Sequence, residues 1–382
     1  MRIQSRVSSL IFPVVVPLLS AFLWSLAPAA ASGVGMWSRR YGVPCGYCHA
    51  YPSLQLTAEG ADFFRRGHRV ENDSWDKNIT HLISAHGEWE WDVAQRQPTS
   101  FQSPELHIHV GGALTKAFSA YVDANVAEGL ETAYLQYTNE WGKESYFTAR
   151  AGKISPTIIR NYGNGLMASA STPLILTDTT LADNPFTPAR DSFGIDLAAR
   201  WKSIFVQTGV VNGEDVEGQA AVNDHKDFFA TGEFALPDGL SGVGLYYYRG
   251  GYSLGDPTVA AFADKYDRKG IFANFTRDRF RVAGAYLYGK DEVATMSDRK
   301  IHGWYAQTDF RATPWLVPFI RWDDVTTETD EGKERIQKGN IGVSIRLFEF
   351  EVTSGRVVLE GSRQREGRVY TTAGLFNVLW MW

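Results

Sequence analysis

The chain has 382 residues, of which 44% are hydrophobic and 21% are charged, so it is neither a disordered nor a collagen-like protein. Aromatic residues reach 13%, which is high for an ordinary soluble protein. The 38 basic residues are outnumbered by 43 acidic residues, and this net charge of −5 argues against nucleic acid as a partner. Because there are only 2 cysteines, a disulfide-stapled scaffold and a four-thiolate iron–sulfur cluster are excluded.

Residues 1–31 have the pattern of a secretory signal peptide. Arg2 and Arg6 precede a long uncharged run, which Pro13 and Pro17 interrupt, and three alanines at its end supply a signal-peptidase site. An N-terminal membrane anchor is the alternative, and the two prolines argue against it. No later segment has the roughly eighteen apolar residues of a spanning helix. The mature protein is therefore expected to be soluble outside the cytoplasm or to cross a membrane as strands.

Both cysteines lie in the motif Cys45-Gly46-Tyr47-Cys48-His49, whose spacing is that of a c-type haem attachment site. On one helical turn, the two thiols can each form a thioether with a haem vinyl group. The adjacent imidazole of His49 then reaches the iron as its proximal ligand. The motif predicts one covalent haem c, held by Cys45, Cys48 and His49.

Three other interpretations of the two cysteines compete with the haem site. A Cys45–Cys48 disulfide stays open for an exported protein. A thioredoxin-like redox pair would need a βαβ context, which does not follow in this sequence. A zinc site would need two further ligands, and no other cysteine exists.

The second axial ligand of the haem iron is not given by any motif. His68 is the only other histidine of the N-terminal segment and is the candidate distal ligand; the alternative is a surface residue in a basic stretch. His81 and His86 are expected in the first strand of the following domain. Met36 and Met167 are the nearest thioethers, and neither lies in an evident haem-facing helix.

Residues 32–78 form the predicted monohaem cytochrome c segment. So short a segment, with little apolar content beyond Phe63 and Phe64, seldom buries enough surface to fold alone. The haem is expected to supply part of its core. The rest is expected to come from docking against the domain that follows.

Residues 79–382 alternate between apolar and polar side chains with a period of two. In 193–201, for example, the odd-numbered residues are apolar or aromatic. The alternation predicts strands of roughly ten residues, the length that a tilted strand needs to cross a bilayer. Tight turns alternate with longer polar loops, as in outer-membrane barrels. The predicted fold is all-β: a transmembrane antiparallel β-barrel of about 16 strands, with the haem segment plugging or capping the pore.

A soluble β-sandwich or propeller is the alternative to a membrane barrel. No blade repeat of fixed period is visible. Trp141, Trp201, Trp315 and Trp380 are predicted near strand ends, where the aromatic girdle of a membrane protein lies. The segment 376–382 ends on an aromatic residue, which is similar to the C-terminal recognition signal of bacterial outer-membrane barrels. The expected location is therefore the bacterial outer membrane.

The longest predicted loop covers residues 154–190 and contains four prolines. A long loop without its own secondary structure is usually functional. It either folds inward and narrows the lumen or lies on the surface. A second feature of the loops is acidic residues that either attract divalent cations or are ordinary solvated charges. These residues are Glu214, Asp215, Glu217, Asp323, Asp324, Asp330 and Glu331.

The residues around the haem motif resemble the start of the fused monohaem cytochrome–porin family, which includes outer-membrane iron-oxidising cytochromes. They are the stretch 40–49 followed by Pro52, Leu54, Gly60, Phe64 and Gly67. Over the barrel the resemblance is architectural only. It implies one haem in or at the pore, passing electrons between extracellular donors and periplasmic carriers. Cys45, Cys48 and His49 carry over, whereas the family is expected to have an aromatic residue at the position of His68.

The leading hypothesis is an outer-membrane electron-transfer protein, an Fe(II)-oxidising cytochrome in enzymatic terms. It takes electrons from extracellular Fe(II) or a similar reductant and passes them to a periplasmic carrier such as a c-type cytochrome. Outward transfer to an extracellular acceptor is the second hypothesis. The third is a solute porin with an accessory periplasmic haem segment, in which lumen charges such as Arg200 and Arg346 act as a selectivity filter.

Overall fold

The computed structural model describes residues 35–50, 55–71, 73–94, 100–101, 105–142, 144–155, 168–177, 186, 188, 191–213, 226–238, 240–254, 262–293, 298–330, 332–350 and 353–381. The predicted signal peptide, Met167 and four of the acidic loop residues (Glu214, Asp215, Glu217 and Glu331) lie outside these residues. Cys45 is described in its backbone only.

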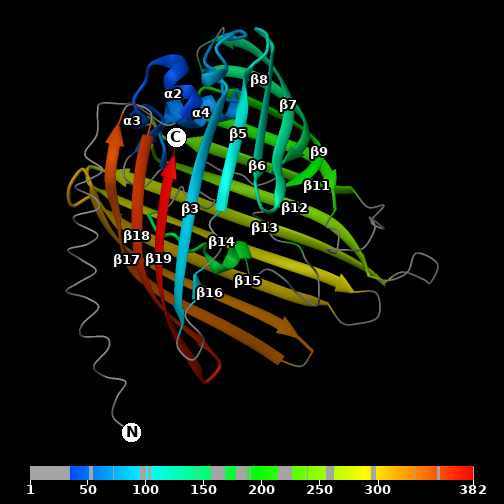
Figure 1. Cartoon of the computed structure of the whole chain (residues 1–382). Coiled ribbons are helices and arrows are strands. Elements are labelled where there is room, and N and C mark those ends of the chain that lie inside the picture. Colours follow the sequence, from blue (N-terminus) through cyan, green and yellow to red (C-terminus); the bar gives the residue numbers. More distant parts are fainter. Residues whose placement is uncertain are drawn as a thin grey trace.

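Within the described residues, sixteen long strands form one closed antiparallel barrel, which confirms the predicted all-β barrel and its strand number (Figure 1). The ring closes where β19 pairs with β3, and β3 pairs in turn with β5. A two-residue strand, β4 (Ser100–Phe101), adds to the far end of β3. The long strands are β3 (Ile83–Ala94), β5 (Glu105–Ala113), β6 (Phe118–Asn125), β7 (Gly129–Gly142), β8 (Ser145–Ile154), β9 (Ser192–Trp201), β10 (Ile204–Asn212), β11 (Lys226–Ala235), β12 (Gly242–Leu254), β13 (Phe262–Arg277), β14 (Phe280–Val293), β15 (Arg299–Phe310), β16 (Leu316–Thr329), β17 (Gly332–Phe350), β18 (Thr353–Glu366) and β19 (Val369–Met381).

Side chains alternate across the barrel wall, because successive residues of a strand point to opposite faces. On β9, Phe193, Ile195 and Leu197 are exposed on the outside, whereas Asp196 between them is buried on the inside. The same alternation is seen on β5, where Leu106, Ile108 and Val110 are exposed and His107 between them is buried. So large an apolar outer surface is unfavourable in water and favourable against lipid. The structure therefore excludes the soluble sandwich and the propeller.

One end of the barrel carries the short connections that follow β5, β7, β9, β11, β13 and β15, and we call it the short-turn end. Trp141, Trp201 and Trp315 lie at this end and are each more than half exposed. The indole of Trp380 occupies the space that a side chain on Gly87 would need. The four tryptophans thus form the predicted girdle at a membrane interface.

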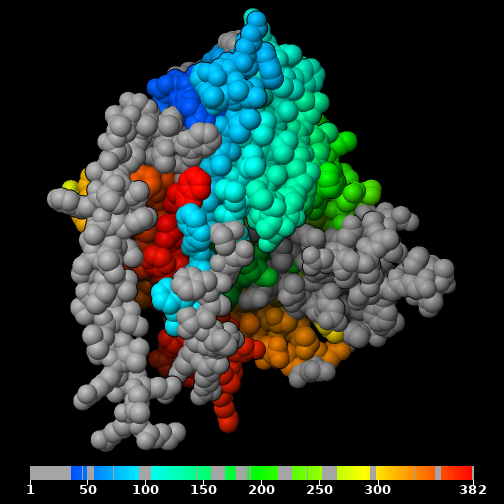
Figure 2. Space-filling model, viewed as in Figure 1, coloured from blue at the N-terminus to red at the C-terminus, as the bar shows by residue number. Residues whose placement is uncertain are grey.

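The N-terminal segment is folded at the same end of the barrel, next to the C-terminus (Figures 1 and 2). In the described residues, no helix is long and apolar enough to span a membrane. Two residues before α4 form a short antiparallel pair with the end of the haem motif. The elements are α2 (Gly35–Tyr41), α3 (Cys45–Cys48), β1 (His49–Ala50), β2 (Gln55–Leu56), α4 (Ala58–Arg65) and η1 (Ile79–His81).

Residues 168–177 of the longest loop lie inside the barrel, which confirms the inward-folding alternative for this part of it. The backbone N–H of Leu174, the first residue of α5 (Leu174–Thr177), donates to the carboxylate of Asp323 at 3.1 Å. Ile175 packs against β15 at Gly303, where a β-carbon would stand 2.7 Å from its side chain. The segment is therefore fastened to the inner wall.

The expectation that Asp323 and Asp324 lie in a loop is wrong. Both belong to β16, which continues to Thr329 and pairs there with Gly332 in a tight hairpin. The ladder extends because the alternation of inward and outward side chains continues through polar residues. Asp330 does lie in the turn after β16.

Candidate functional site

The two cysteines of the haem motif lie on one helical turn, α3, as the sequence predicts. Thr57 fastens the next helix to this turn. Its hydroxyl donates to the carbonyl of Tyr47 at 2.7 Å, and its N–H donates to the carbonyl of Cys48 at 2.9 Å. The same hydroxyl accepts the N–H of Gly60 at 3.1 Å and so caps α4. A single side chain thus fixes the motif and starts the helix that packs on it.

Gly60 brings α4 into direct contact with the motif. A β-carbon at this position would stand 2.1 Å from the carbonyl oxygen of Cys48, so only glycine fits without moving the backbone. Sequence reasoning named Gly60 through the family resemblance alone. The structure gives the physical reason for it.

The residues around the motif fit a haem c. Phe64 lies one turn after Gly60, on the same face of α4, and is 44% exposed. Tyr47 within the motif is 46% exposed. A planar apolar group tethered to Cys48 would cover aromatic surface that this small segment otherwise leaves in contact with solvent. Cys48 and His49 are both half-buried.

His68 is buried, so its assignment as a surface residue is wrong. It follows the end of α4, where the N–H of His68 donates to the carbonyl of Phe63 at 2.9 Å and Gly67 takes a φ of +79°. This turn directs the imidazole inward. Its ring lies parallel to that of Trp37 at 4.3 Å, and its Nδ1 lies 3.0 Å from the hydroxyl of Tyr134.

Burial lowers the pKa of His68 to about 3, and the nearby His109 and Arg150 act in the same direction. The imidazole is therefore neutral at physiological pH. With Nδ1 engaged by Tyr134, Nε2 is the atom through which it would ligate a metal. The distal-ligand assignment stays a prediction.

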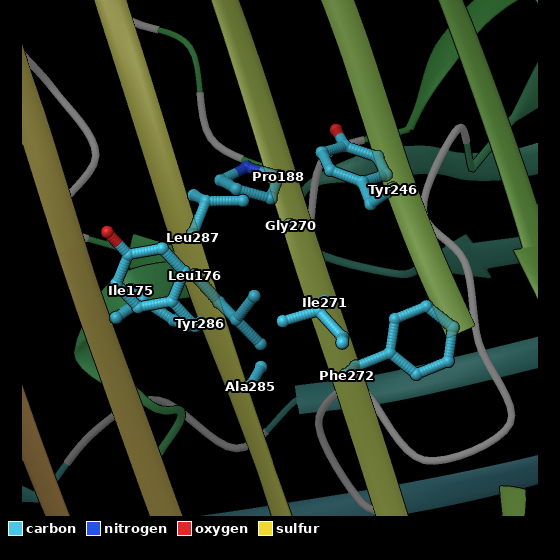
Figure 3. Close-up of a pocket in the computed structure, with 10 residues that line it drawn as sticks. All are labelled: Ile175, Leu176, Pro188, Tyr246, Gly270, Ile271, Phe272, Ala285, Tyr286 and Leu287. Carbon is cyan, nitrogen blue, oxygen red and sulfur yellow. The ribbon is translucent and has the colours of Figure 1, made fainter. Parts of the chain in front are cut away.

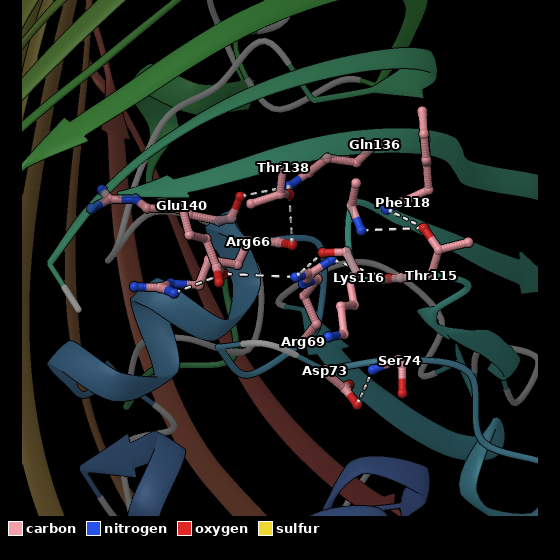
Figure 4. Close-up of polar contacts among 12 residues, drawn as sticks. Arg66, Arg69, Asp73, Ser74, Thr115, Lys116, Phe118, Gln136, Thr138 and Glu140 are labelled. Atoms are coloured by element: carbon pink, nitrogen blue, oxygen red, sulfur yellow. Dashed lines mark hydrogen bonds and ion pairs between the residues drawn. The ribbon is translucent and has the colours of Figure 1, made fainter. Parts of the chain in front are cut away.

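Three arginines at the end of α4 pair with carboxylates of the barrel wall, and Figure 4 shows Arg66 and Arg69, the two of them that face Glu140. Arg65 lies 2.7 Å from Glu233 on β11, and Arg66 lies 2.8 Å from Glu140 on β7. Arg69 lies 3.8 Å from the same Glu140. Both glutamates point into the lumen, and these side chains are nearly or fully buried. The basic stretch of the sequence is thus the docking surface of the N-terminal segment.

The backbone of this docking surface is also held by the barrel. The amide nitrogen of Gln136 donates to the carbonyl of Arg65 at 2.9 Å, and Arg69 donates to the carbonyl of Lys116 at 2.5 Å (Figure 4). Asp62 on α4 pairs with Arg200 of β9, which the sequence predicts as a lumen charge. The N-terminal segment therefore contacts inward-facing residues of β6 to β11 at the short-turn end.

A second group of residues extends along the inner wall from the docked segment. His86 lies in β3, as predicted, whereas His81 lies in η1 and not in the strand. His86 Nδ1 is 2.6 Å from His109 Nε2, and His109 Nδ1 is 2.8 Å from the hydroxyl of Tyr121. His107 precedes His109 on the same face of β5. Sequence reasoning missed this group, for which the i, i+2 spacing of two histidines was the available signal.

These rings join the haem segment to the lumen wall without a break. Neighbouring centroids in the series lie 4.2, 4.9, 6.0, 4.2 and 4.3 Å apart. We call the series the ring chain; it runs through His107, His86, His109, Tyr121, His68 and Trp37. It starts at Trp37 in α2, at the short-turn end, and extends along the inner wall toward the opposite end of the barrel.

The wall of β13 to β16 is built differently. Arg268 pairs with Asp291, and Arg321 with Asp323, and all four side chains are fully buried. Arg321 also donates to the hydroxyl of Ser169 at 2.9 Å, so that it holds the inward loop. Beside this loop is a small apolar crevice, centred on Gly270, that Ile175 and Leu176 help to line (Figure 3). Arg346, the other predicted lumen charge, lies in β17.

No family model matches the chain, and no curated protein matches it either. The comparison with solved structures finds porins. The barrel is similar to OmpT, an outer-membrane protein of Vibrio cholerae, with a TM-score of 0.59 and 11% identity over 78% of this chain and 96% of that one. It is also similar to an anion-selective porin from Comamonas acidovorans, with a TM-score of 0.57 and 9% identity over 78% of this chain and 98% of that one.

A third similar structure is the outer-membrane channel DcaP of Acinetobacter baumannii, with a TM-score of 0.51 and 8% identity over 79% of this chain and 95% of that one. At such identities the likeness shows the fold. This chain has the fold of the bacterial outer-membrane porins, which agrees with the predicted location.

Proposed function

We propose that this chain is an outer-membrane electron-transfer protein, in which a porin-type barrel holds a covalent haem c at its short-turn mouth. It would take electrons from extracellular Fe(II) or a similar reductant and deliver them to a periplasmic carrier. The observation that supports this function is the position of the haem motif. α4, fixed to the motif by Thr57 and Gly60, is docked on the inner wall through buried ion pairs.

The residues that would hold the haem are Cys45 and Cys48, through thioethers, and His49, as the proximal ligand. The bound haem would supply reversible one-electron chemistry at its iron. Thr57 and Gly60 set the position of the turn that carries these residues.

The orientation of the barrel is consistent with electron transfer between the outer side and the periplasmic side of the membrane. In outer-membrane barrels the short turns face the periplasm and the longer loops face outward. The haem motif would then lie on the periplasmic side, where the exposed side chain of Tyr47 would be open to a carrier. The ring chain extends from His68 and Trp37 toward the outer side. Contiguous rings shorten the gaps that an electron from an external donor must cross.

Absorption spectroscopy of the purified full-length protein tests this function. The reduced-minus-oxidised spectrum should show one c-type haem per chain. Stopped-flow mixing with Fe(II) should reduce it. The double variant Cys45→Ala/Cys48→Ala should lose the spectrum while keeping the heat-sensitive electrophoretic mobility of a folded barrel. An oxidised haem that Fe(II) leaves unchanged would exclude inward electron transfer from iron.

A solute channel with an accessory haem segment is the second candidate, and the porin fold itself favours it. Planar-bilayer conductance separates the two. The electron-transfer function predicts low conductance in the intact protein and higher conductance when residues 32–78 are deleted. A large, steady conductance in the intact protein would support the channel.

The second axial ligand is tested by two variants. His68→Phe keeps an aromatic ring beside Trp37 and removes the imidazole nitrogen, and Met36→Leu removes the fully buried thioether of α2. If His68 is the ligand, only the first variant should change the near-infrared and magnetic-resonance signals of the ferric haem. If Met36→Leu changes these signals and His68→Phe does not, the His68 assignment is wrong.

A further inference from the structure

His107 is surrounded by three carboxylates. Its Nδ1 lies 3.1 Å from Asp123 Oδ1 and 3.7 Å from a Glu131 oxygen, and its Nε2 lies 3.6 Å from Glu105. Even a doubly protonated imidazole would bring one positive charge to three negative ones. On a partly buried inner wall, this imbalance favours a cation.

Glu131 reaches this position because of a β-bulge. Asp123 pairs with Thr132, whereas the next residue, Ala124, pairs with Leu130, so Glu131 is the extra residue of β7. In a regular strand Glu131 would point away from the face of Thr132. Bulges commonly redirect a side chain next to a functional site. Here the bulge directs a carboxylate to the imidazole of the neighbouring β5.

The spacing of these atoms is that of ligands around one metal ion. Bonds of about 2.0–2.2 Å from nitrogen and oxygen to a transition-metal ion place neighbouring ligand atoms about 3.0–3.5 Å apart. The separation from His107 Nδ1 to Asp123 is 3.1 Å, within this range, and that to Glu131 is 3.7 Å, so the Glu131 carboxylate would move inward by a few tenths of an ångström on binding. Within the described residues, His107, Asp123 and Glu131 can present ligand atoms that all lie within 4.8 Å of one another.

We propose that His107, Asp123 and Glu131 form a binding site for a divalent transition-metal ion on the inner wall. Imidazole together with carboxylate is a donor set for Fe(II), Mn(II), Co(II) and Zn(II) rather than for a soft ion such as Cu(I). Assigning Fe(II) as the physiological occupant rests on the proposed electron-transfer function. Metal binding itself does not.

The place of the site in the structure agrees with an external donor. His107 stacks on His86 at 4.2 Å, so the site lies at one end of the ring chain and the haem segment lies at the other. Fe(II) bound there would enter from the loop side and would be in contact with a continuous series of rings.

Titration of the detergent-purified full-length protein with Co(II), followed by calorimetry and by the visible d–d bands, tests the site. Co(II) reports on nitrogen and oxygen ligation and does not depend on haem reduction. We expect one ion per chain. Asp123→Asn/Glu131→Gln should lower the affinity at least tenfold, which is about 1.4 kcal/mol. The matched control is Glu88→Gln, which removes a carboxylate from the neighbouring β3 and keeps a hydrogen-bond acceptor for Asn377.

The outcomes separate this site from the proposed function. Co(II) binding that the double variant loses and the control keeps supports the site, even if Fe(II) fails to reduce the haem. Equal losses in the double variant and the control would show general attraction of cations to the lumen and would overturn the site. Absence of stoichiometric binding in the folded wild-type barrel would also overturn it. Heat-sensitive electrophoretic mobility shows that each variant is folded.

Discussion

The buried carboxylates on two parts of the lumen wall, β13 to β16 and β5 to β7, have different kinds of partner. On β13 to β16 the buried carboxylates of Asp291, Asp309 and Asp323 each face an arginine; Arg321 and Asp323, for example, are fully buried 2.9 Å apart. On β5 to β7 the carboxylates of Asp123 and Glu131 face imidazoles instead. Guanidinium groups stay charged and saturate a carboxylate permanently, whereas an imidazole can give up its proton to solvent and then offers a nitrogen lone pair to a ligand. The wall of β13 to β16 therefore holds the inward loop in place, whereas the wall of β5 to β7 can bind a ligand.

The largest expected effect comes from breaking the arginine wall. Arg321→Ala leaves Asp323 buried without its partner, which should cost about 3–5 kcal/mol. Because Arg321 also holds Ser169 and Ser171, residues 168–177 should detach from the wall. Limited proteolysis of the loop and a higher single-channel conductance would report this change. Lys333→Ala, which removes an exposed ion pair with Glu328, is the control and should leave the stability nearly unchanged, because solvent screens the pair.

A smaller effect is expected where the haem segment meets the wall. Glu140→Ala removes the carboxylate that faces Arg66 and Arg69, and a lost charge-assisted bond typically costs about 1.5–3 kcal/mol. Amide hydrogen exchange over 58–71 should become faster. Asn139→Ala changes the outward neighbour and should leave exchange unchanged. If both variants exchange alike, Glu140 does not hold the segment.

Acid should loosen the same docking through His68. Its pKa is lowered to about 3 in the docked segment, against roughly 6.5 when exposed, so the neutral imidazole stabilises docking above pH 6.5. That stability is lost as the pH falls through the window from 6.5 to 3, by about 1–2 kcal/mol at pH 5. His109 and Arg150 are the charged groups nearby, with Tyr121 and Tyr134 in contact.

The measurement for His68 is hydrogen exchange of α4 between pH 7.5 and 5, corrected for intrinsic rates. It is best made in the Cys45→Ala/Cys48→Ala background, where no haem can be attached. His68→Phe should flatten the pH dependence. A slope that persists in His68→Phe would assign it to another group.

The smallest expected effect separates backbone strain from steric contact. In Gly67→Ala the residue must keep a φ of +79°, and its new β-carbon would stand 2.2 Å from the hydroxyl of Ser119. In Gly367→Ala the residue must keep a φ of +56°, but its β-carbon would stand in open space. Strain alone costs about 1 kcal/mol. Thermal unfolding should therefore show a larger loss for Gly67→Ala. Equal losses would mean that Ser119 moves away without cost.

The alternation of side chains made the barrel predictable. Within each strand, the apolar positions show which face meets lipid. The number of strands, the tryptophan girdle and most strand boundaries follow from this alternation. The errors lie where polar residues continue a strand, as at Asp323 and Asp324 in β16. A hairpin that projects beyond the membrane has no apolar face to mark its end.

The candidate site was only partly predictable. The spacing of Cys45, Cys48 and His49 shows itself in the sequence, because attachment of a haem depends on one local turn. The burial of His68 does not, because it is decided by barrel residues more than fifty positions away, such as Tyr134.

By itself, the sequence determined the barrel, its export pattern and the haem motif, since each depends on neighbours in the chain. Only the tertiary structure decided that His86, His107 and Asp123 meet, because three different strands carry them. It also decided that Glu131 points toward them, since a bulge reverses the face that its position in the alternation would give. The alternation along one strand shows on which face of the wall a residue lies, whereas the register between strands decides which residues are neighbours on that face.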